Sequence, residues 1–189
     1  MQHATVALLT EADYLAGEPY STIRHEFVDG HVYAMTGASK AHNTIVLNIA
    51  TRLHPHLRGS PCRAYVADMR VRVETARAYY YPDIVVTCAG PDTAADAPSH
   101  YLTAPVLIAE ILSESTETLD RREKMRAYAQ LDSLREYVLV DSRSARAELY
   151  RTRPEGGWEQ WIAAPGETLR LDSVGLDLAV DDLYEDVTF

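Results

Sequence analysis

The sequence predicts a mixed α/β domain in which helices pack against a central β-sheet. Two continuous apolar runs, residues 84–88 and 106–112, are typical of strands that are covered on both faces. A segment that begins at Ser39 carries an apolar residue at every fourth position from Ile45 to Leu57, which is the spacing of one helix face. The expected order is helix, hairpin, long helix, several strands, helix and more strands, and this order favours an α+β or mixed α/β fold.

Turn and capping residues predict the first elements of the chain. Residues 10–13, Thr-Glu-Ala-Asp, resemble a capping box and open a short helix that runs through Ala16. Residues 23–27 and 31–35 flank Asp29-Gly30, a two-residue turn that is typical of a β-hairpin. The domain is therefore expected to begin with a helix and an N-terminal hairpin.

Strand patterns dominate the middle of the chain. Residues 64–73 alternate between apolar and polar side chains and are expected to form one strand. Residues 89–104 are rich in Pro, Asp, Ala and Ser, which favours a loop. A second helix is expected over residues 116–130, with Ser115 or Thr116 as its cap.

The last third of the chain predicts a further buried strand over residues 137–140 and then an antiparallel meander. Gly156-Gly157 supplies one of its turns. The strands of this meander are expected at residues 146–151, 158–162 and 169–171.

Size and composition point to a single domain that spans residues 1–189. Hydrophobic residues make up 47% of the chain and charged residues 24%, which is an ordinary balance for a globular protein. No apolar run approaches the ~20 residues of a membrane helix, and no basic flank with an apolar segment opens the chain. We therefore expect a soluble, cytoplasmic protein that does not enter a membrane.

The two cysteines, Cys62 and Cys88, do not form a CxxC motif and have no histidine at metal-ligand spacing. A structural zinc site is not expected, and we interpret both residues as small buried hydrophobic side chains.

The net charge of −10 opposes a protein whose main task is to grip nucleic acid, because phosphate binding draws on basic surface. It does not exclude a nuclease, since bound metal ions neutralise a carboxylate-rich site.

Three features carry candidate chemistry. Asp83 follows Tyr81-Pro82 at the start of a predicted strand, and Glu110 interrupts the apolar run 106–112. A carboxylate inside a buried strand is costly unless it is paired, hydrogen-bonded or bound to a metal. The third feature is the stripe Asp120, Lys124 and Tyr128, which lies on one face of the second helix.

Two carboxylates on neighbouring strands can share Mg²⁺ or Mn²⁺, and a nearby lysine can orient water and stabilise charge on a phosphate. Simpler interpretations stay open. Asp83 could cap a turn after Pro82, and Glu110 could form a buried ion pair with Lys124 or an arginine. Asp120 and Lys124, taken alone, favour a routine surface pair.

The ordered set of motifs resembles the PD-(D/E)XK nuclease superfamily, and within it the Uma family of small restriction endonuclease-like proteins. The family's "E-h-x-S" strand is matched by residues 110–113, and its helix "D-x-x-x-K-x-x-x-Y" by Asp120, Lys124 and Tyr128. The following strand "eYwlvD" is matched by Glu-Tyr-Val-Leu-Val-Asp at 136–141. Upstream, "yElidG" and "H-x-x-i" resemble residues 25–30 and 42–45, so the likeness covers nearly the whole chain.

The resemblance implies a restriction endonuclease-like fold and a set of site residues. Asp83, Glu110 and the backbone carbonyl of Ile111 would bind the metal. Leu112 stands where the superfamily has its lysine, and Lys124 from the next helix would take that place. Glu26 would be the acidic residue contributed before the sheet, where it could bind a second metal or fix Lys124. The alternative interpretation is an exposed residue on a hairpin strand.

Two more residues carry open interpretations. His42 could contact phosphate or water, although a capping or surface histidine is the simpler interpretation. Asp68 could face the same cleft. Basic and aromatic side chains are also interleaved in this region, and such a pattern can bind a phosphate backbone or stack bases. We favour an edge-strand face or a dimer contact. The residues are Arg63, Arg70, Arg72, Arg77, Tyr79, Tyr80 and Tyr81.

The leading hypothesis is a Mg²⁺- or Mn²⁺-dependent endonuclease that hydrolyses DNA phosphodiester bonds. Cutting both strands of a duplex generally requires two sites, so a homodimer is expected. Two alternatives stay open: a catalytically inactive binding or assembly module with the nuclease fold, and a metal-dependent hydrolase of small phosphoesters.

Overall fold

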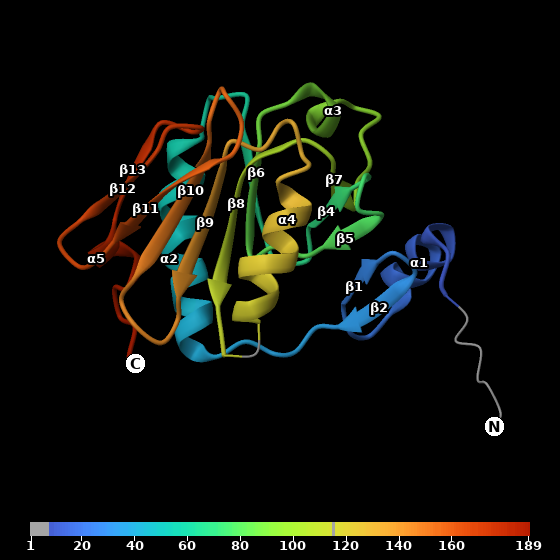
Figure 1. The fold of residues 1–189 in the computed structure, drawn as a ribbon, viewed down its shortest axis with the longest axis horizontal. Coiled ribbons are helices and arrows are strands. Elements are labelled where there is room, and N and C mark those ends of the chain that lie inside the picture. Colours follow the sequence, from blue (N-terminus) through green and yellow to red (C-terminus); the bar gives the residue numbers. More distant parts are fainter. Residues whose placement is uncertain (1–7, 115) are drawn as a thin grey trace.

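The computed structural model describes residues 8–114 and 116–189, which form three β-sheets with helices packed around them (Figure 1). The helices are α1 (Glu11–Gly17), η1 (Glu18–Tyr20), α2 (Lys40–His56), α3 (Gly90–Thr93), the π-helix η2 (Leu119–Lys124), α4 (Met125–Tyr128) and α5 (Val180–Leu183). The strands are β1 (His25–Val28), β2 (His31–Ala34), β3 (Arg63–Val66), β4 (Arg70–Val73), β5 (Ala78–Tyr80), β6 (Ile84–Thr87), β7 (Tyr101–Leu102), β8 (Pro105–Leu112), β9 (Glu136–Asp141), β10 (Ala147–Thr152), β11 (Trp158–Ala163), β12 (Thr168–Leu171) and β13 (Leu176–Ala179).

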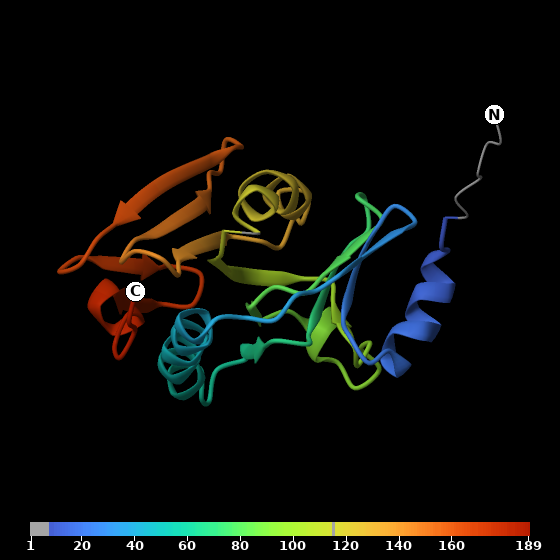
Figure 2. The ribbon, with the colours of Figure 1, turned by 90° about the horizontal axis from the view of Figure 1, so that it is seen from below.

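The central sheet has the order β11-β10-β9-β8-β6-β3, and the mixed α/β prediction is confirmed. Strands β8 and β9 are parallel, and the other neighbours in this sheet are antiparallel. Figure 2 shows α2 on one face of the sheet and η2 with α4 on the other. The N-terminal sheet has the order β2-β1-β5-β4-β7, and β12 pairs with β13 in a small third sheet.

The pleat of β8 sorts its side chains between two hydrophobic clusters. Leu107, Ala109 and Ile111 pack with the buried stripe of α2, whereas Ile108 and Leu112 pack with α4 on the opposite face. Successive residues of a strand point to opposite faces, so Glu110 lies on the face that η2 and α4 cover. The apolar runs were therefore read correctly as strands covered on both sides.

The N-terminal predictions are confirmed. Thr10 accepts a hydrogen bond from the backbone N–H of Asp13 and caps α1. Strands β1 and β2 form the hairpin, and its turn residues Asp29 and Gly30 have φ angles of 44° and 90°. Two consecutive positive φ values are those of a type I′ turn, which asparagine, aspartate and glycine tolerate best.

The single strand predicted over residues 64–73 is wrong. Ala67 and Asp68 both have positive φ, 33° and 54°, and they turn the chain from β3 at the edge of the central sheet into β4 of the N-terminal sheet. Neither glycine nor proline marks this turn in the sequence, so the alternating pattern continues across it unbroken.

The interpretation of the arginine and tyrosine segment as a surface or dimer contact is wrong for its central residues. Strands β4 and β5 are interior strands of the N-terminal sheet. Tyr79, Tyr80, Tyr81 and Arg70 are at most 4% exposed. Of these arginines and tyrosines, only Arg63 and Arg77 are exposed to solvent, and Arg72 is half-buried.

Two helix and loop predictions need correction. The second helix was expected over residues 116–130, and the helical residues run from Glu117 through η2 and α4 to Tyr128, while Ser115 lies outside the described residues. The segment 89–104, expected to be a loop, contains the short helix α3 and strand β7.

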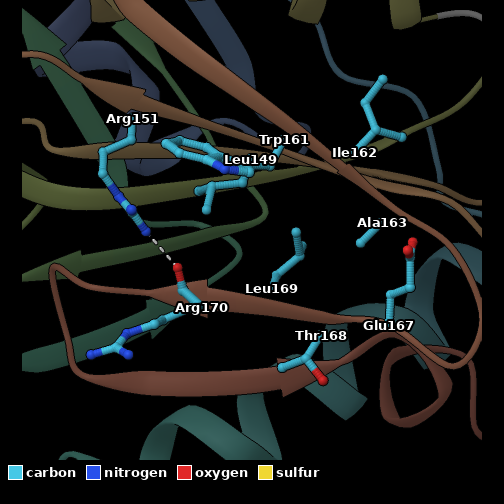
Figure 3. Close-up of a pocket in the computed structure, with 9 residues that line it drawn as sticks. All are labelled: Leu149, Arg151, Trp161, Ile162, Ala163, Glu167, Thr168, Leu169 and Arg170. Carbon is cyan, nitrogen blue, oxygen red and sulfur yellow. Dashed lines mark hydrogen bonds between the residues drawn. The ribbon is translucent and has the colours of Figure 1, made fainter.

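The C-terminal meander is confirmed for β10 and β11, with Gly156 and Gly157 at positive φ in the turn between them. The third strand of the prediction, β12, pairs with β13 instead of β11. Figure 3 shows the cavity of about 320 Å³ that separates β12 from β10 and β11. Arg151 crosses this cavity: its guanidinium lies 4.8 Å from the Trp161 ring and donates to the carbonyl of Arg170.

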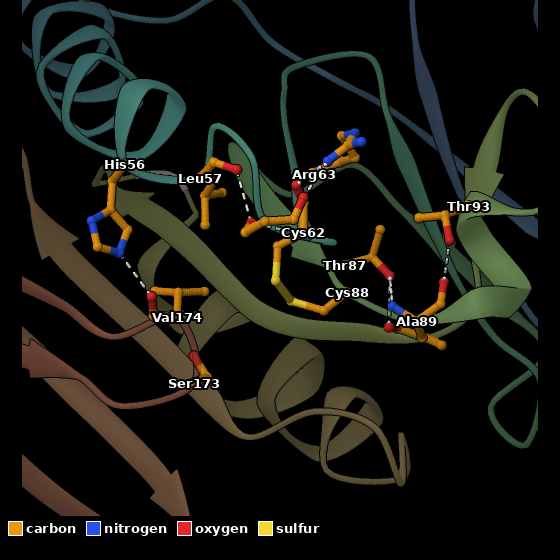
Figure 4. The surroundings of a disulfide bond; sticks show 12 residues. His56, Leu57, Cys62, Arg63, Thr87, Cys88, Ala89, Thr93, Ser173 and Val174 are labelled. Carbon is orange, nitrogen blue, oxygen red and sulfur yellow. Dashed lines mark hydrogen bonds between the residues drawn. A yellow bond between two sulfur atoms is a disulfide. The ribbon is translucent and has the colours of Figure 1, made fainter.

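Cys62 and Cys88 form a disulfide, so their interpretation as unpaired buried side chains is wrong (Figure 4). The two residues are brought together because they flank the paired strands β3 and β6, whose terminal residue pair is Arg63 with Thr87. The expectation failed because the register of two strands that meet only in the folded sheet is not visible in the sequence.

Reduction of this disulfide is expected to lower the free energy of unfolding by about 2–4 kcal/mol, because it releases a loop of 26 residues in the unfolded chain. Urea unfolding with and without a reductant measures this difference. The variant with both Cys62→Ala and Cys88→Ala should match the reduced protein and should not respond to the reductant. Equal stability of the oxidised and reduced protein would contradict this prediction.

In the part of the chain that is described, every helix is too short or too polar to pass through a lipid bilayer.

Candidate active site

The candidate site lies where the chain crosses from the N-terminal sheet to the central sheet. Strand β5 ends at Tyr80, and the crossover Tyr81-Pro82-Asp83 leads directly into β6. The last residue pair of β6 and β8 is Ile84 with Ala109, so the next pair in the same antiparallel register is Asp83 with Glu110. The register of β6 and β8 therefore places the two carboxylates that the sequence predicted opposite each other.

Strand β6 no longer pairs with β8 beyond Ile84, and the side chain of Asp83 accepts a hydrogen bond from the β8 backbone instead. Because β6 begins only at Ile84, the backbone N–H of Ile111 donates to Asp83 Oδ2 at 2.7 Å. The backbone N–H of Asp83 faces Glu110 Oε2 at 3.4 Å. On its other side, Asp83 Oδ1 lies 3.1 Å from His42 Nε2 in the first turn of α2. Asp83 and His42 are both partly exposed, so this end of the site meets solvent.

Lys124 is held by three carboxylates at the buried end of the site. Its Nζ lies 2.9 Å from Glu26 Oε1, 3.2 Å from Glu110 Oε1 and 3.2 Å from Asp120 Oδ1. Each of these four side chains is at most 8% exposed. The hydroxyl of Tyr128 donates a further hydrogen bond to Glu110 Oε1 at 3.2 Å. We refer to Glu26, Asp83, Glu110, Asp120 and Lys124 as the carboxylate cluster.

Helix η2 brings two of these residues over β8. Asp120 and Lys124 are four positions apart and point to the same side of the helix, toward the face of the sheet that carries Glu110. π-helices are rare in proteins, but those that do occur are frequently found at functional sites. Arg121, between them in sequence, points the other way and pairs with Glu148 of β10 through two hydrogen bonds, 2.8 and 3.0 Å long.

The charges of the carboxylate cluster do not balance. Three buried carboxylates share the single ammonium of Lys124, and the fourth carboxylate, Asp83, contacts His42 instead. Burial raises the pKa of Glu110 well above its usual range, although Lys124 opposes this shift. Burial likewise raises the pKa of Asp120. Ionisation of these buried carboxyls is therefore unfavourable in the folded protein, and a bound cation would stabilise their charged forms.

Lys124 remains an ammonium in this environment. Burial alone would lower its pKa, but Glu110, Glu26 and Asp120 together raise the pKa well above its usual range. A lysine held in this way donates hydrogen bonds and positive charge at neutral pH, and does not accept a proton from water.

The donor set fits a hard divalent cation. Carboxylate and carbonyl oxygens are the ligands of Mg²⁺, which is commonly held by one or two carboxylates and completes its shell with water and substrate phosphate. Among the described residues, no three His, Cys, Asp or Glu side chains form a ready-made metal cage. The partly exposed Asp83 and the neighbouring Glu110 therefore offer two ligands at most without rearrangement, and Ile111 a carbonyl.

The structure brings together all four residues expected to be catalytic, which are Asp83, Glu110, Lys124 and Glu26. Asp120 was favoured as a surface partner of Lys124, and that interpretation is wrong because it is 2% exposed. His42 was favoured as a capping or surface residue, and its ring contacts Asp83 instead.

Asp68 does not belong to the site. It is exposed in the turn between β3 and β4 and pairs with Arg24. Sequence reasoning gave no reason to join Glu26 to Lys124 apart from the family resemblance, because the two lie almost a hundred residues apart. The large cavity beside Trp161 shares no lining residue with the carboxylate cluster.

The pair of Arg121 and Glu148 predicts a pH-dependent stability. Burial would raise the pKa of Glu148, but hydrogen bonds from Arg121 and Tyr150 lower the pKa to about 2. A carboxyl whose folded pKa is depressed stabilises the protein fully above its unfolded pKa of about 4.3, and this stabilisation is lost as the pH falls toward 2.

Glu148→Gln is accordingly expected to cost on the order of 2 kcal/mol of unfolding free energy at pH 6 and far less near pH 2. Unfolding in urea at a series of pH values measures the difference, with Glu159→Gln on the exposed strand β11 as the control. A stability loss that does not change between pH 6 and pH 2 would contradict the assignment.

A mixed sheet that carries paired carboxylates on adjacent strands, with a lysine from the following helix, defines a restriction endonuclease-like protein. A family model described as "Putative restriction endonuclease" and named Uma2 matches residues 12–181. The chain belongs to the Uma2 family.

Two curated relatives and one solved structure extend this comparison. The uncharacterized protein slr1290 of Synechocystis sp. (strain ATCC 27184 / PCC 6803 / Kazusa) is 35% identical over 96% of this chain and 94% of its own length. Protein sll1609 of the same organism is 33% identical over 84% and 88%. A crystal structure from Anabaena variabilis ATCC 29413, described as "a putative nuclease belonging to DUF820", has the same fold. Its TM-score is 0.77 at 17% identity, and the likeness covers 97% of this chain and 100% of that one.

Proposed function

We propose that the protein is a metal-dependent endonuclease that hydrolyses phosphodiester bonds of DNA. The observation that carries this proposal is the carboxylate cluster, in which Asp83 and Glu110 face each other beside a buried ammonium. Membership of a family described as "Putative restriction endonuclease" supports the same reaction class. We further propose that Mg²⁺ or Mn²⁺ is the cofactor and that two copies act together on duplex DNA.

Asp83, Glu110 and the carbonyl of Ile111 are the proposed metal ligands, because they combine hard oxygen donors with the one solvent-exposed edge of the cluster. The metal, when bound, would supply Lewis-acid polarisation of the phosphate and lower the pKa of the attacking water.

The chain's own residues have distinct tasks in this proposal. Lys124, held as an ammonium, donates to an oxygen of the phosphate or the attacking water and stabilises the charge that develops there. Glu26 and Asp120 fix the position of Lys124 through their ion pairs. Tyr128 holds Glu110 by its hydrogen bond, and His42 positions Asp83 through the contact of its Nε2 with Oδ1.

Cleavage of supercoiled plasmid DNA tests the proposal. The purified protein is expected to nick or linearise the plasmid with Mg²⁺ or Mn²⁺ and to be inactive with a chelator. Activity that persists in Asp83→Ala and Glu110→Ala would exclude this site as the source. A nucleotide phosphoester assayed in parallel separates DNA cleavage from hydrolysis of small phosphoesters.

A second candidate is a non-catalytic binding or assembly module. It is favoured by Lys124, which already occupies the centre of three carboxylates, and by Leu112 at the usual lysine position. Calorimetric titration with Mn²⁺ discriminates between the two. Absence of binding at millimolar Mn²⁺, with dimerisation intact in size-exclusion chromatography, would favour the module.

A further inference from the structure

Arg70 is a buried arginine without a carboxylate partner in the part of the chain that is described. It lies on β4 and is 3% exposed, and none of the ion pairs there includes it. Its Nε donates to the carbonyl of His100 at 3.1 Å, while its Nη1 is buried without a hydrogen-bond partner. An arginine cannot lose its proton, so the positive charge is present in the folded protein.

The rings around Arg70 do not take the place of a counter-ion. Its guanidinium carbon lies 5.5 Å from the centre of the Tyr14 ring and 5.9 Å from those of Tyr79 and Tyr81. A cation–π contact is an attraction to the electron-rich face of a ring that carries no formal charge. Burial of an ion is costly unless the ion is paired and its donors are hydrogen-bonded. An anion beside Arg70 would supply the missing compensation.

A cavity of about 150 Å³ lies at this position, and Arg70 forms part of its wall. A water molecule takes up about 30 Å³ in the liquid, so the cavity has room for a tetrahedral oxyanion. Arg24 contributes a second guanidinium, and the other lining residues are Glu18, Pro19, Asp68, Tyr81 and His100.

The acidic residues of the wall leave Arg70 available. Glu18 is already engaged, since its carboxylate accepts from the backbone N–H of His25 at 2.7 Å and from the Tyr81 hydroxyl at 3.1 Å. Asp68 is exposed, and its contacts with Arg24 are long, at 3.4 and 3.5 Å. Arg24 can therefore turn toward a ligand without leaving a buried carboxylate unpaired.

We propose that this cavity is a binding site for a phosphate group, held by Arg70 and Arg24. Guanidinium groups match phosphate oxygens in charge and in geometry, and two of them suit a dianion. The site is separate from the carboxylate cluster but shares the crossover with it, because the backbone N–H of Tyr81 donates to Glu26 at 3.1 Å. The phosphate comes either from free inorganic phosphate or from the backbone of a nucleic acid.

Calorimetric titration of the metal-free protein with inorganic phosphate, at constant chloride concentration, tests the proposal. The native protein is expected to bind phosphate saturably at one site. Arg70→Met should weaken this binding by about tenfold or more, which corresponds to about 1.4 kcal/mol or more. Arg24→Gln, which changes an exposed side chain, should weaken it several-fold. Arg58→Gln, an exposed arginine after α2, is the control and should bind as the native protein does.

Two results would overturn the proposal: no saturable binding to the native protein, or equal binding by the native protein and both cavity variants. If Arg70→Met does not fold, Arg24→Gln decides, since its change lies at the surface. Competition with a short single-stranded oligonucleotide that has no terminal phosphates shows whether the bound phosphate group is free phosphate or part of a nucleic-acid backbone. Displacement of phosphate assigns the site to the nucleic-acid backbone, and lack of displacement assigns it to free phosphate. Phosphate binding and its displacement are both measured without reference to nuclease activity, so they test this site separately from the proposed function.

Discussion

Lys124→Met is expected to lower the free energy of unfolding by about 3–5 kcal/mol, because it leaves buried carboxylates without their shared counter-ion. Glu26, Glu110 and Asp120 all lie within 3.2 Å of the ammonium that the change removes. Urea unfolding at pH 7 measures the loss. Lys40→Met is a matched control, since Lys40 is the other lysine of the chain and is exposed at the start of α2.

The cause of this destabilisation can be separated from a loss of packing. The pKa of Glu110 and that of Asp120 are already raised by burial, and removal of the ammonium raises them further. Groups with raised folded pKa values are protonated as the pH falls, so the deficit of Lys124→Met should shrink toward pH 5. Adding Glu110→Gln to Lys124→Met should recover part of the stability at pH 7. A deficit that is the same at both pH values and in the double variant would show that methionine merely packs badly.

The sequence predicts the fold where one physical signal dominates. Continuous apolar runs identified β6 and β8, and Asp29-Gly30 identified the first hairpin. The prediction from sequence failed where the chain passes from one sheet to the other, because Ala67 and Asp68 adopt positive φ without a glycine to mark the turn. The disulfide was missed for a related reason, since it depends on a register that forms only when β3 meets β6.

The candidate site was predictable in part from burial chemistry. A charged residue within the apolar run of β8 requires a partner, and Glu110 has Lys124 and Tyr128. The environment of Asp120 was not predictable, because a pair four residues apart on a helix has the same pattern in water and in a core. Only the position of η2 over β8, where Lys124 contacts Glu110, decides between them.

His42 and Glu26 reach the site from elements remote in sequence. His42 lies in the first turn of α2, and Glu26 lies on β1 of the N-terminal sheet. No local pattern joins these elements to β8, so their places depend on the crossover at Tyr81-Pro82-Asp83 that brings the two sheets together. Glu26 was predicted as a site residue from the family resemblance alone, because no periodic pattern in the sequence points to it.

Glu110→Gln is expected to separate stability from activity. Burial raises the pKa of Glu110, which means that its ionised form costs the folded protein free energy at neutral pH. A neutral amide of the same shape should therefore leave the unfolding free energy at pH 7 unchanged or higher. Metal-dependent cleavage should fall by about 100- to 1,000-fold, because a bound metal supplies several kcal/mol and each 1.4 kcal/mol is about tenfold in rate.

Three measurements on the same preparations test this prediction. Plasmid cleavage with Mn²⁺ gives the activity, calorimetry gives the Mn²⁺ affinity, and urea unfolding gives the stability. Glu123→Gln is the matched control, since Glu123 lies on η2 but is exposed to solvent. Loss of activity together with loss of stability would indicate a structural ion pair with Lys124. Full activity and full Mn²⁺ affinity would remove Glu110 from the metal site. A stable protein that neither binds Mn²⁺ nor cleaves DNA is the combination that only a functional carboxylate, kept at a cost to folding, explains.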